Sequence, residues 1–159
     1  MGRLVGMRPD RTAAIARALR ALLQQGENVL AAVEVQSPGA GVQEESTGLQ
    51  RKRALWREQV IALGIDSRYG ERPAWLYLAL TDRRVILAQR SRLTGSVREL
   101  LGAWPLQQLT ALEVPRSGTT ATLGFGEREL RLELPQAHRF LPEVYRELPA
   151  RWAAACDGS

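Results

Sequence analysis

The stretch that most restricts the fold is WLYLALTDRRVILAQR, residues 75–90. Two apolar runs, rich in the residue types that strands favour, flank the polar corner TDRR at 81–84. Aspartate is common at such a corner because its carboxylate accepts a hydrogen bond from the backbone two residues further on. The pattern therefore predicts an antiparallel hairpin with strands at 75–81 and 84–90.

The remaining strand signals make the chain mainly β. Alternating or apolar runs between turn residues predict five further strands, at 29–35, 96–103, 109–114, 119–125 and 128–134. In the last of these runs Leu130 and Leu132 alternate with Arg131 and Glu133. Successive side chains of a strand point to opposite faces, so this alternation predicts one buried face and one solvated face.

Helical spacing marks the two ends of the chain. The segment 11–25 carries one aliphatic face, made of Ile15, Leu19, Leu22 and Leu23. This face predicts a helix that packs on the domain, with a partner-binding amphipathic helix as the alternative. From residue 136 a second apolar face predicts a closing helix, and its members are Leu141, Val144, Tyr145, Leu148 and Trp152. Pro149 lies within that helix and predicts a kink, because proline removes a backbone hydrogen bond.

A long insertion separates the first two predicted strands. It covers about 36–74, whereas two to five residues are usual for a hairpin loop. Residues 37–50, SPGAGVQEESTGLQ, are rich in Ser, Gly, Pro and Glu and predict a flexible loop. The following RKRALWREQVIALGI, at 51–65, combines helical spacing with strand-like alternation near its end. We expect a short helix that frays into extended chain.

The length of 159 residues is typical of one domain. We expect a leader and helix at 1–26, with Met7 as an alternative start, a domain at 27–155 and a tail at 156–159. The net charge of +5 allows attraction to nucleic acid, anionic lipid or acidic protein without choosing among them. Lys52 is the only lysine, so the excess of arginine is equally explained by the base composition of a genome.

Catalytic and metal chemistry find no support in the sequence. Cys156 is the only cysteine, which excludes an internal disulfide framework and predicts a reducing, cytoplasmic location. His138 is the only histidine, and we expect it to be a surface or cap residue because one imidazole cannot build a zinc site. The sequence contains no phosphate-binding loop, dinucleotide fingerprint or nucleophile elbow. We therefore expect no enzymatic activity, no metal and no cofactor.

Four features in chain order carry a resemblance. They are Gly26-Glu27 before the first strand, the LTDRR turn at 80–84, the step from Pro105 to Leu109, and the single closing helix. Together they resemble the bacterial pleckstrin-homology-like domains, relatives of the GRAM branch. The resemblance implies seven strands in two nearly orthogonal antiparallel sheets, curled into a barrel that the C-terminal helix caps. It also implies that Thr81 and Asp82 fix the corner, while Arg84 enters the next strand and pairs with a nearby carboxylate.

One constellation of basic residues lies in the insertion: Arg51, Lys52, Arg53, Arg57, Arg68 and Arg72. Trp56 and Tyr69 are interleaved with it. Arginines that meet phosphates beside aromatic rings that insert at an interface are typical of proteins on anionic membranes and of single-stranded nucleic-acid binders. The alternative is that Trp56 packs on the barrel and the arginines are solvated.

These observations favour a non-catalytic binding or scaffolding module of a bacterial cytoplasm. The first hypothesis is protein–protein interaction through the insertion or the exposed edges of the barrel. The second is peripheral association with an anionic membrane surface through the arginine-rich insertion. Nucleic-acid binding is the weakest hypothesis, because it depends on net charge alone.

Overall fold

The computed structural model describes residues 12–40, 46–115, 118–135, 138 and 141–157. Its strands are β1 (Val29–Gln36), β2 (Trp75–Thr81), β3 (Arg84–Arg90), β4 (Val97–Pro105), β5 (Ala111–Glu113), β6 (Thr120–Phe125) and β7 (Arg128–Glu133). Its helices are α2 (Thr47–Ala62), α3 (Arg68–Glu71) and α5 (Pro142–Asp157), with 3₁₀ turns η1 (Arg20–Leu22) and η2 (Leu106–Gln108). Residues 12–18 form a further helix before η1. The seven predicted strands and the closing helix are confirmed.

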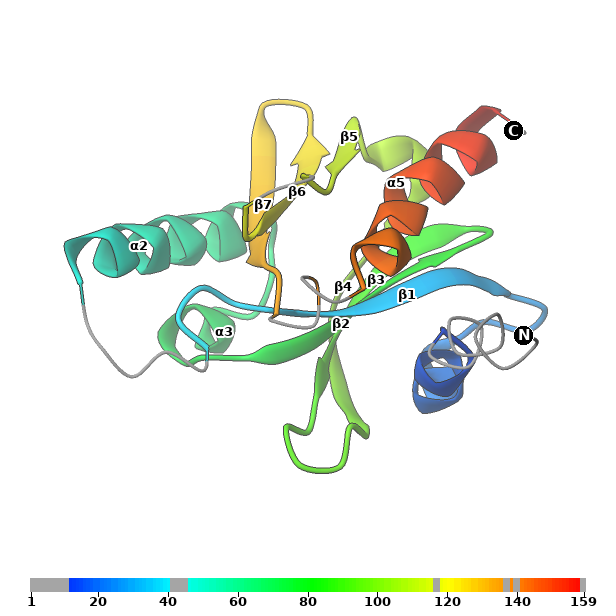
Figure 1. Ribbon diagram of the computed structural model, residues 1–159, viewed down its shortest axis with the longest axis horizontal. Helices are drawn as coiled ribbons and strands as arrows, with labels where there is room; N and C mark the ends of the chain where they lie inside the picture. The colour runs from blue at the N-terminus through cyan, green and yellow to red at the C-terminus, as the bar shows by residue number, and fades with distance from the viewer. Residues whose placement is uncertain (1–11, 41–45, 116–117, 136–137, 139–140, 158–159) are drawn as a thin grey trace.

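The strands form one antiparallel sheet in the order β4-β3-β2-β1-β7-β6-β5. Strand β1 pairs with β2 over its whole length, but it meets β7 at a single residue pair, Gln36 opposite Glu133. Figure 1 shows β6 and β7 running across the direction of β1 and β2. The two halves of the sheet therefore diverge from this one pair. Their description as two orthogonal sheets, and the closure of a barrel, stay predictions.

The inner face of the sheet holds the main core. Leucines that alternate along β2 and β7 are buried there, as the period of two requires. The C-terminal helix α5 contributes Val144, Tyr145 and Leu148 to the same cluster, and Trp152 packs against it. The Tyr145 hydroxyl donates to the Glu34 carbonyl at 2.8 Å, which fixes α5 to β1. Each such fully buried aliphatic side chain stabilises the fold by about 1.5–3 kcal/mol.

The outer face of β1–β3 is buried as well. Ala32, Ala79 and Ile86 form a second cluster with Ile15 and Leu19 of the N-terminal helical segment. Alanines on the strands let the helix approach the sheet closely, so the middle of the sheet is covered on both sides. The predicted packing of the N-terminal aliphatic stripe on the domain is confirmed.

The insertion is more ordered than the sequence predicted. Helix α2 starts at Thr47, where the Ser46 hydroxyl accepts from the Leu49 amide at 3.1 Å and caps the helix, and it stays helical to Ala62. The expectation of a short helix that frays into extended chain is wrong, because the capped start and the buried Trp56 and Val60 hold the whole segment. Residues 37–40 are also buried rather than part of a solvated loop, whereas 41–45 lie outside the described residues.

Helix α2 lies beside β7 at the point where the sheet divides (Figure 1). Three contacts fasten it there. The Lys52 ammonium pairs with Glu133 at 3.1 Å, the Gln59 Oε1 accepts from the Arg131 amide at 3.0 Å, and an Arg128 guanidinium nitrogen donates to the Ala62 carbonyl at 2.8 Å. The helix thus covers the edge of β7 that has diverged from β1.

The C-terminal boundary also differs from expectation. Helix α5 continues through Asp157, so Cys156 belongs to the helix rather than to a tail. Pro149 lies inside α5, and the kink predicted at this residue stays a prediction. The predicted leader lies outside the described residues.

Candidate functional site

The turn between β2 and β3 is built around a buried carboxylate. Glu27, just before β1, accepts from Arg84 Nε at 2.9 Å, from Arg84 Nη2 at 3.0 Å and from the Thr81 hydroxyl at 2.6 Å. The Glu27 side chain is fully buried, and that of Arg84 is 16% exposed. The Thr81 oxygen accepts in turn from the amides of Arg83 and Arg84. Arg84 therefore has the carboxylate partner that the resemblance implied.

Electrostatics at this cluster favour the charged form of Glu27. Burial raises the pKa of the carboxyl, but hydrogen bonds from Arg84, Thr81 and the Gln24 amide outweigh burial and lower the pKa to about 2. Asp82 closes the other side of the turn, where its carboxylate accepts from the Asn28 amide at 3.1 Å. The bond to backbone two residues further on, which the sequence assigned to the aspartate, is made instead by the Thr81 hydroxyl, which accepts from the Arg83 amide. All three turn residues are thus used internally, which makes the turn a structural element.

The six basic residues of the insertion do not form one patch. Lys52 is paired with Glu133, and Arg68 is paired with Asp66 at 2.9 Å and with Glu99 at 3.2 Å. Arg53, Arg57 and Arg72 line a separate hollow of about 180 Å³ between α2 and the segment after α3, next to Glu71. Arg51 is exposed on α2. The six residues therefore do not share one face, and two of them, Lys52 and Arg68, are paired with acids.

The two aromatic residues assigned to an interface are buried. Trp56 is 3% exposed, and its indole nitrogen donates to the Tyr69 carbonyl at 2.7 Å. The Tyr69 hydroxyl donates to Glu99, and burial together with this acidic partner raises the pKa of Tyr69. Neither ring is exposed for insertion into a membrane or stacking on bases. The alternative, in which Trp56 packs in the domain, is the arrangement observed.

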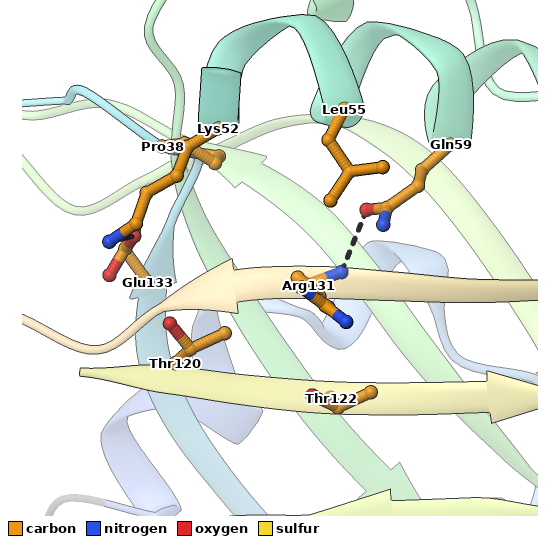
Figure 2. Close-up of a pocket in the computed structure, with 8 residues that line it drawn as sticks. All are labelled: Pro38, Lys52, Leu55, Gln59, Thr120, Thr122, Arg131 and Glu133. Carbon is orange, nitrogen blue, oxygen red and sulfur yellow. Dashed lines mark hydrogen bonds and ion pairs between the residues drawn. The ribbon is translucent and has the colours of Figure 1, made fainter. Parts of the chain in front are cut away.

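A pocket of about 280 Å³ lies between α2 and the outer face of β6 and β7. Figure 2 shows side chains from three elements converging on it. They are Lys52, Leu55 and Gln59 from α2, Thr120 and Thr122 from β6, Arg131 and Glu133 from β7, and Pro38 after β1. Their outward position on the strands follows from the alternation that buries Ala121, Leu123, Leu130 and Leu132 on the opposite face.

A second pocket, of about 430 Å³, continues along the N-terminal half of α2. It shares Lys52 and Glu133 with the first pocket, so their ion pair lies between the two. Its other lining groups include Leu49 and Thr119. We call the two pockets together the α2 groove.

Gln59 is the one lining residue of the first pocket whose polar group is both buried and incompletely paired among the residues that the structure describes. Its Oε1 accepts from the Arg131 amide, while its Nε2 has no hydrogen-bond partner. The backbone amide can only donate, so it fixes which end of the side-chain amide is oxygen. A buried donor without an acceptor costs about 1–3 kcal/mol, which makes this nitrogen a position where an entering group gains free energy.

Sequence reasoning placed Lys52 in a basic cluster and missed the groove. Gln59 carries no motif, and its role depends on α2 lying against β7. The sequence offered one signal. Arg131 and Glu133 alternate with leucines and so lie on the outer face of β7, and two threonines occupy alternate positions of β6. That pattern marks a polar strand face without showing that a helix covers part of it.

His138 is a further departure from the sequence prediction. It is 6% exposed and packs edge-on against Tyr145, with ring centroids 5.2 Å apart, so the expectation of a surface or cap residue is wrong. Burial lowers the pKa of this imidazole, and the nearby positive charge of Arg146 lowers it further.

Within the described ranges, no group of three or more His, Cys, Asp or Glu residues is arranged to hold a metal ion. In the same part of the chain, no helix is both long enough and apolar enough to cross a membrane.

Comparison with known proteins adds little to this geometry. No family model and no curated protein matches the chain. Among solved structures, the chain is similar to the crystal structure of a DUF1696 family protein with a pleckstrin-homology domain from Shewanella loihica PV-4. The two are 14% identical over 86% of this chain and 91% of that chain, with a TM-score of 0.37. A similarity this low carries no argument about fold or function.

Proposed function

We propose that this chain is a non-catalytic, pleckstrin-homology-like binding module of a bacterial cytoplasm that holds a segment of a partner protein in the α2 groove. The proposed architecture is two nearly orthogonal half-sheets closed into a barrel. It is supported by the strand order, by the single β1–β7 pair and by α5 packed over the inner face. The relation to the GRAM branch belongs to the same proposal.

The observation that carries the functional part is the α2 groove itself. Its walls are regular secondary structure, a capped helix and two paired strands, and such walls hold binding groups in fixed positions. The side chains on β6 that face it are threonines, which are too short to fill the space beneath α2. An open hollow beside a buried, unsatisfied amide is typical of a site that a partner completes.

A protein segment fits this groove better than a membrane does. A bilayer contacts projecting, charged surfaces, whereas the groove is recessed and its Lys52 is already paired with Glu133. The aromatic residues that would anchor a membrane contact are buried. Peripheral binding to anionic lipid therefore has less support, and nucleic-acid binding still depends on net charge alone.

The test is affinity capture with a blocked groove. Thr122→Trp places a large ring in the first pocket, and Leu93→Trp places the same ring on a loop residue that is 94% exposed and serves as the matched control. Both variants are first checked for an unchanged urea midpoint. We expect a partner that is retained by the wild type and by Leu93→Trp to be lost from Thr122→Trp.

Two results would contradict the proposal. One is a partner set that is identical for all three proteins. The other is salt-sensitive sedimentation with anionic vesicles that disappears when Arg51, Lys52, Arg53 and Arg57 are neutralised, because that result assigns binding to a membrane surface.

A further inference from the structure

We infer that the α2 groove recognises an acidic side chain of the bound segment, whose carboxylate accepts from Gln59 Nε2 and pairs with Lys52. This inference rests on the proposed function and specifies the chemistry of the same site. It is independent of the arginine hollow on the other side of α2.

The polar groups of the first pocket are dominated by donors. Lys52, Arg131 and the Gln59 amide nitrogen can only donate, and Glu133 is the one carboxylate among the eight lining residues. Lys52 is paired with Glu133, and Arg131 is paired with Glu129 at 2.8 Å. The Gln59 nitrogen is left without an acceptor. The group that completes this set must therefore supply acceptor oxygens.

The orientation of Gln59 makes this requirement specific. The Arg131 amide holds the Gln59 oxygen, so the side chain cannot flip to present that oxygen to a ligand. The nitrogen is buried and has no acceptor among the residues that the structure describes, so an oxygen that reaches it removes the cost of leaving this donor unpaired. A ligand donor at this position would meet another donor and be rejected.

A carboxylate is favoured over a neutral carbonyl because the two cations in the pocket are held only by partly exposed pairs. The Lys52 side chain is 53% exposed while that of its partner Glu133 is 15% exposed, and the side chains of the Arg131–Glu129 pair are 51% and 41% exposed. Such pairs are weak and exchange readily with another anion. An entering carboxylate can therefore share Lys52 with Glu133 without breaking a buried ion pair.

Size and shape favour one residue of an extended segment. At about 280 Å³, the first pocket is just below the ~300–1,000 Å³ of typical small-molecule sites, and it suits a single acidic side chain with its neighbouring backbone. Leu55, Pro38 and the threonine methyl groups offer apolar contact for the aliphatic stem (Figure 2). The second pocket, beyond Lys52, gives room for the next residues of the segment.

The inference is tested by NMR titration of the full chain with two capped amino acids, N-acetylglutamate N-methylamide and its glutamine counterpart. We expect the glutamate compound to shift the Gln59 side-chain amide and the Arg131 backbone amide in a saturable way. The glutamine compound should bind at least about fivefold more weakly, because hydrogen bonds to a charged group are stronger than those to a neutral one.

Two variants separate the groove from general charge effects. Lys52→Met should weaken glutamate binding several-fold. Arg51→Met removes the same charge from the adjacent, exposed position of α2, and it should leave binding unchanged within about twofold. Both residues lie on one helix, so a loss caused by destabilised α2 would appear in the urea midpoint of the variant.

The inference is overturned if the glutamine compound binds as tightly as the glutamate compound, if neither shifts the Gln59 and Arg131 signals, or if Arg51→Met weakens binding as much as Lys52→Met. The proposed function fails on a different result, the retention of the partner by Thr122→Trp. If Thr122→Trp loses the partner but neither capped amino acid binds, the proposed function stands and the inference of an acidic side chain is wrong.

Discussion

Replacing Glu27 by glutamine should destabilise the domain more than most single substitutions do. The Glu27 carboxylate is fully buried and accepts four hydrogen bonds: from Arg84 Nε, from Arg84 Nη2, from the Thr81 hydroxyl and from the Gln24 amide. Glu27→Gln keeps the shape but puts a donor where one acceptor oxygen was. It also leaves the Arg84 guanidinium without its counter-charge.

Two independent arguments give about the same loss in the free energy of unfolding. Removing one partner of a buried ion pair costs about 3–5 kcal/mol. The lowering of the Glu27 pKa from its ordinary value of 4.5 to about 2 corresponds to about 3 kcal/mol of stability at neutral pH. With a urea slope of about 2 kcal/mol per M, typical of a small domain, the unfolding midpoint should fall by about 1.5 M.

The assay is urea unfolding followed by far-UV circular dichroism, with Glu129→Gln as the control. Glu129 pairs with Arg131 in an exposed position, so its loss should change the unfolding free energy by less than about 1 kcal/mol. A Glu27→Gln midpoint equal to that of Glu129→Gln would refute the assignment of Glu27 and Arg84 as the anchor of the turn.

The pH dependence gives a second check on the same residue. Because the fold lowers the pKa of Glu27, its contribution is fully present above about pH 4.5 and is lost as the pH falls toward 2. The wild type should therefore lose about 3 kcal/mol over this range that Glu27→Gln does not lose. Parallel stability curves for the two proteins between pH 4.5 and 2 would contradict the reasoning.

Three further substitutions test the packing, each by its urea midpoint. Trp56→Phe should cost about 1–3 kcal/mol because the Tyr69 carbonyl loses a buried donor, and an unchanged midpoint would argue against that bond. Gly39→Ala should cost about 1 kcal/mol or more, because φ is +90° and the new Cβ would lie 2.5 Å from Arg53 Nε. Gly126→Ala is the control: its φ is +74° but its Cβ would meet open space, so it measures the cost of the backbone conformation without the steric contact. The fold lowers the pKa of the buried His138 imidazole, so the wild type should lose stability as the pH falls below about 6.5, and His138→Phe should remove that loss. A wild type whose stability does not change with pH in that range would contradict this.

The local features of the fold were readable from the sequence. The hairpin at 75–90 and the closing helix appear where the patterns predicted them. These signals come from neighbours two to four residues apart, whose side chains share a face whatever the rest of the chain does. At the turn this holds for Thr81, whose hydroxyl accepts from the Arg83 amide two residues further on, but not for Asp82, whose carboxylate accepts from the Asn28 amide in a distant part of the chain.

The structure of the insertion could not be predicted from such local patterns. Its polar start and mixed periodicity predicted a loose, partly helical arm, but α2 is held by Trp56 and Val60 in the core and by contacts to β7. The sequence contains no local sign of the diverged β7 edge that α2 covers. The burial of His138 was likewise not predicted, because it depends on contact with Tyr145 of helix α5.

The sequence by itself determined the seven strands, the two terminal apolar helix faces and the β2–β3 corner. Only the tertiary structure decided that Arg84 reaches Glu27, 57 residues earlier, and that Lys52 and Gln59 meet β7 to form a groove. The reason is physical. Periodicity states which face of an element is apolar, but the partner of a polar side chain depends on which distant elements the buried faces bring together.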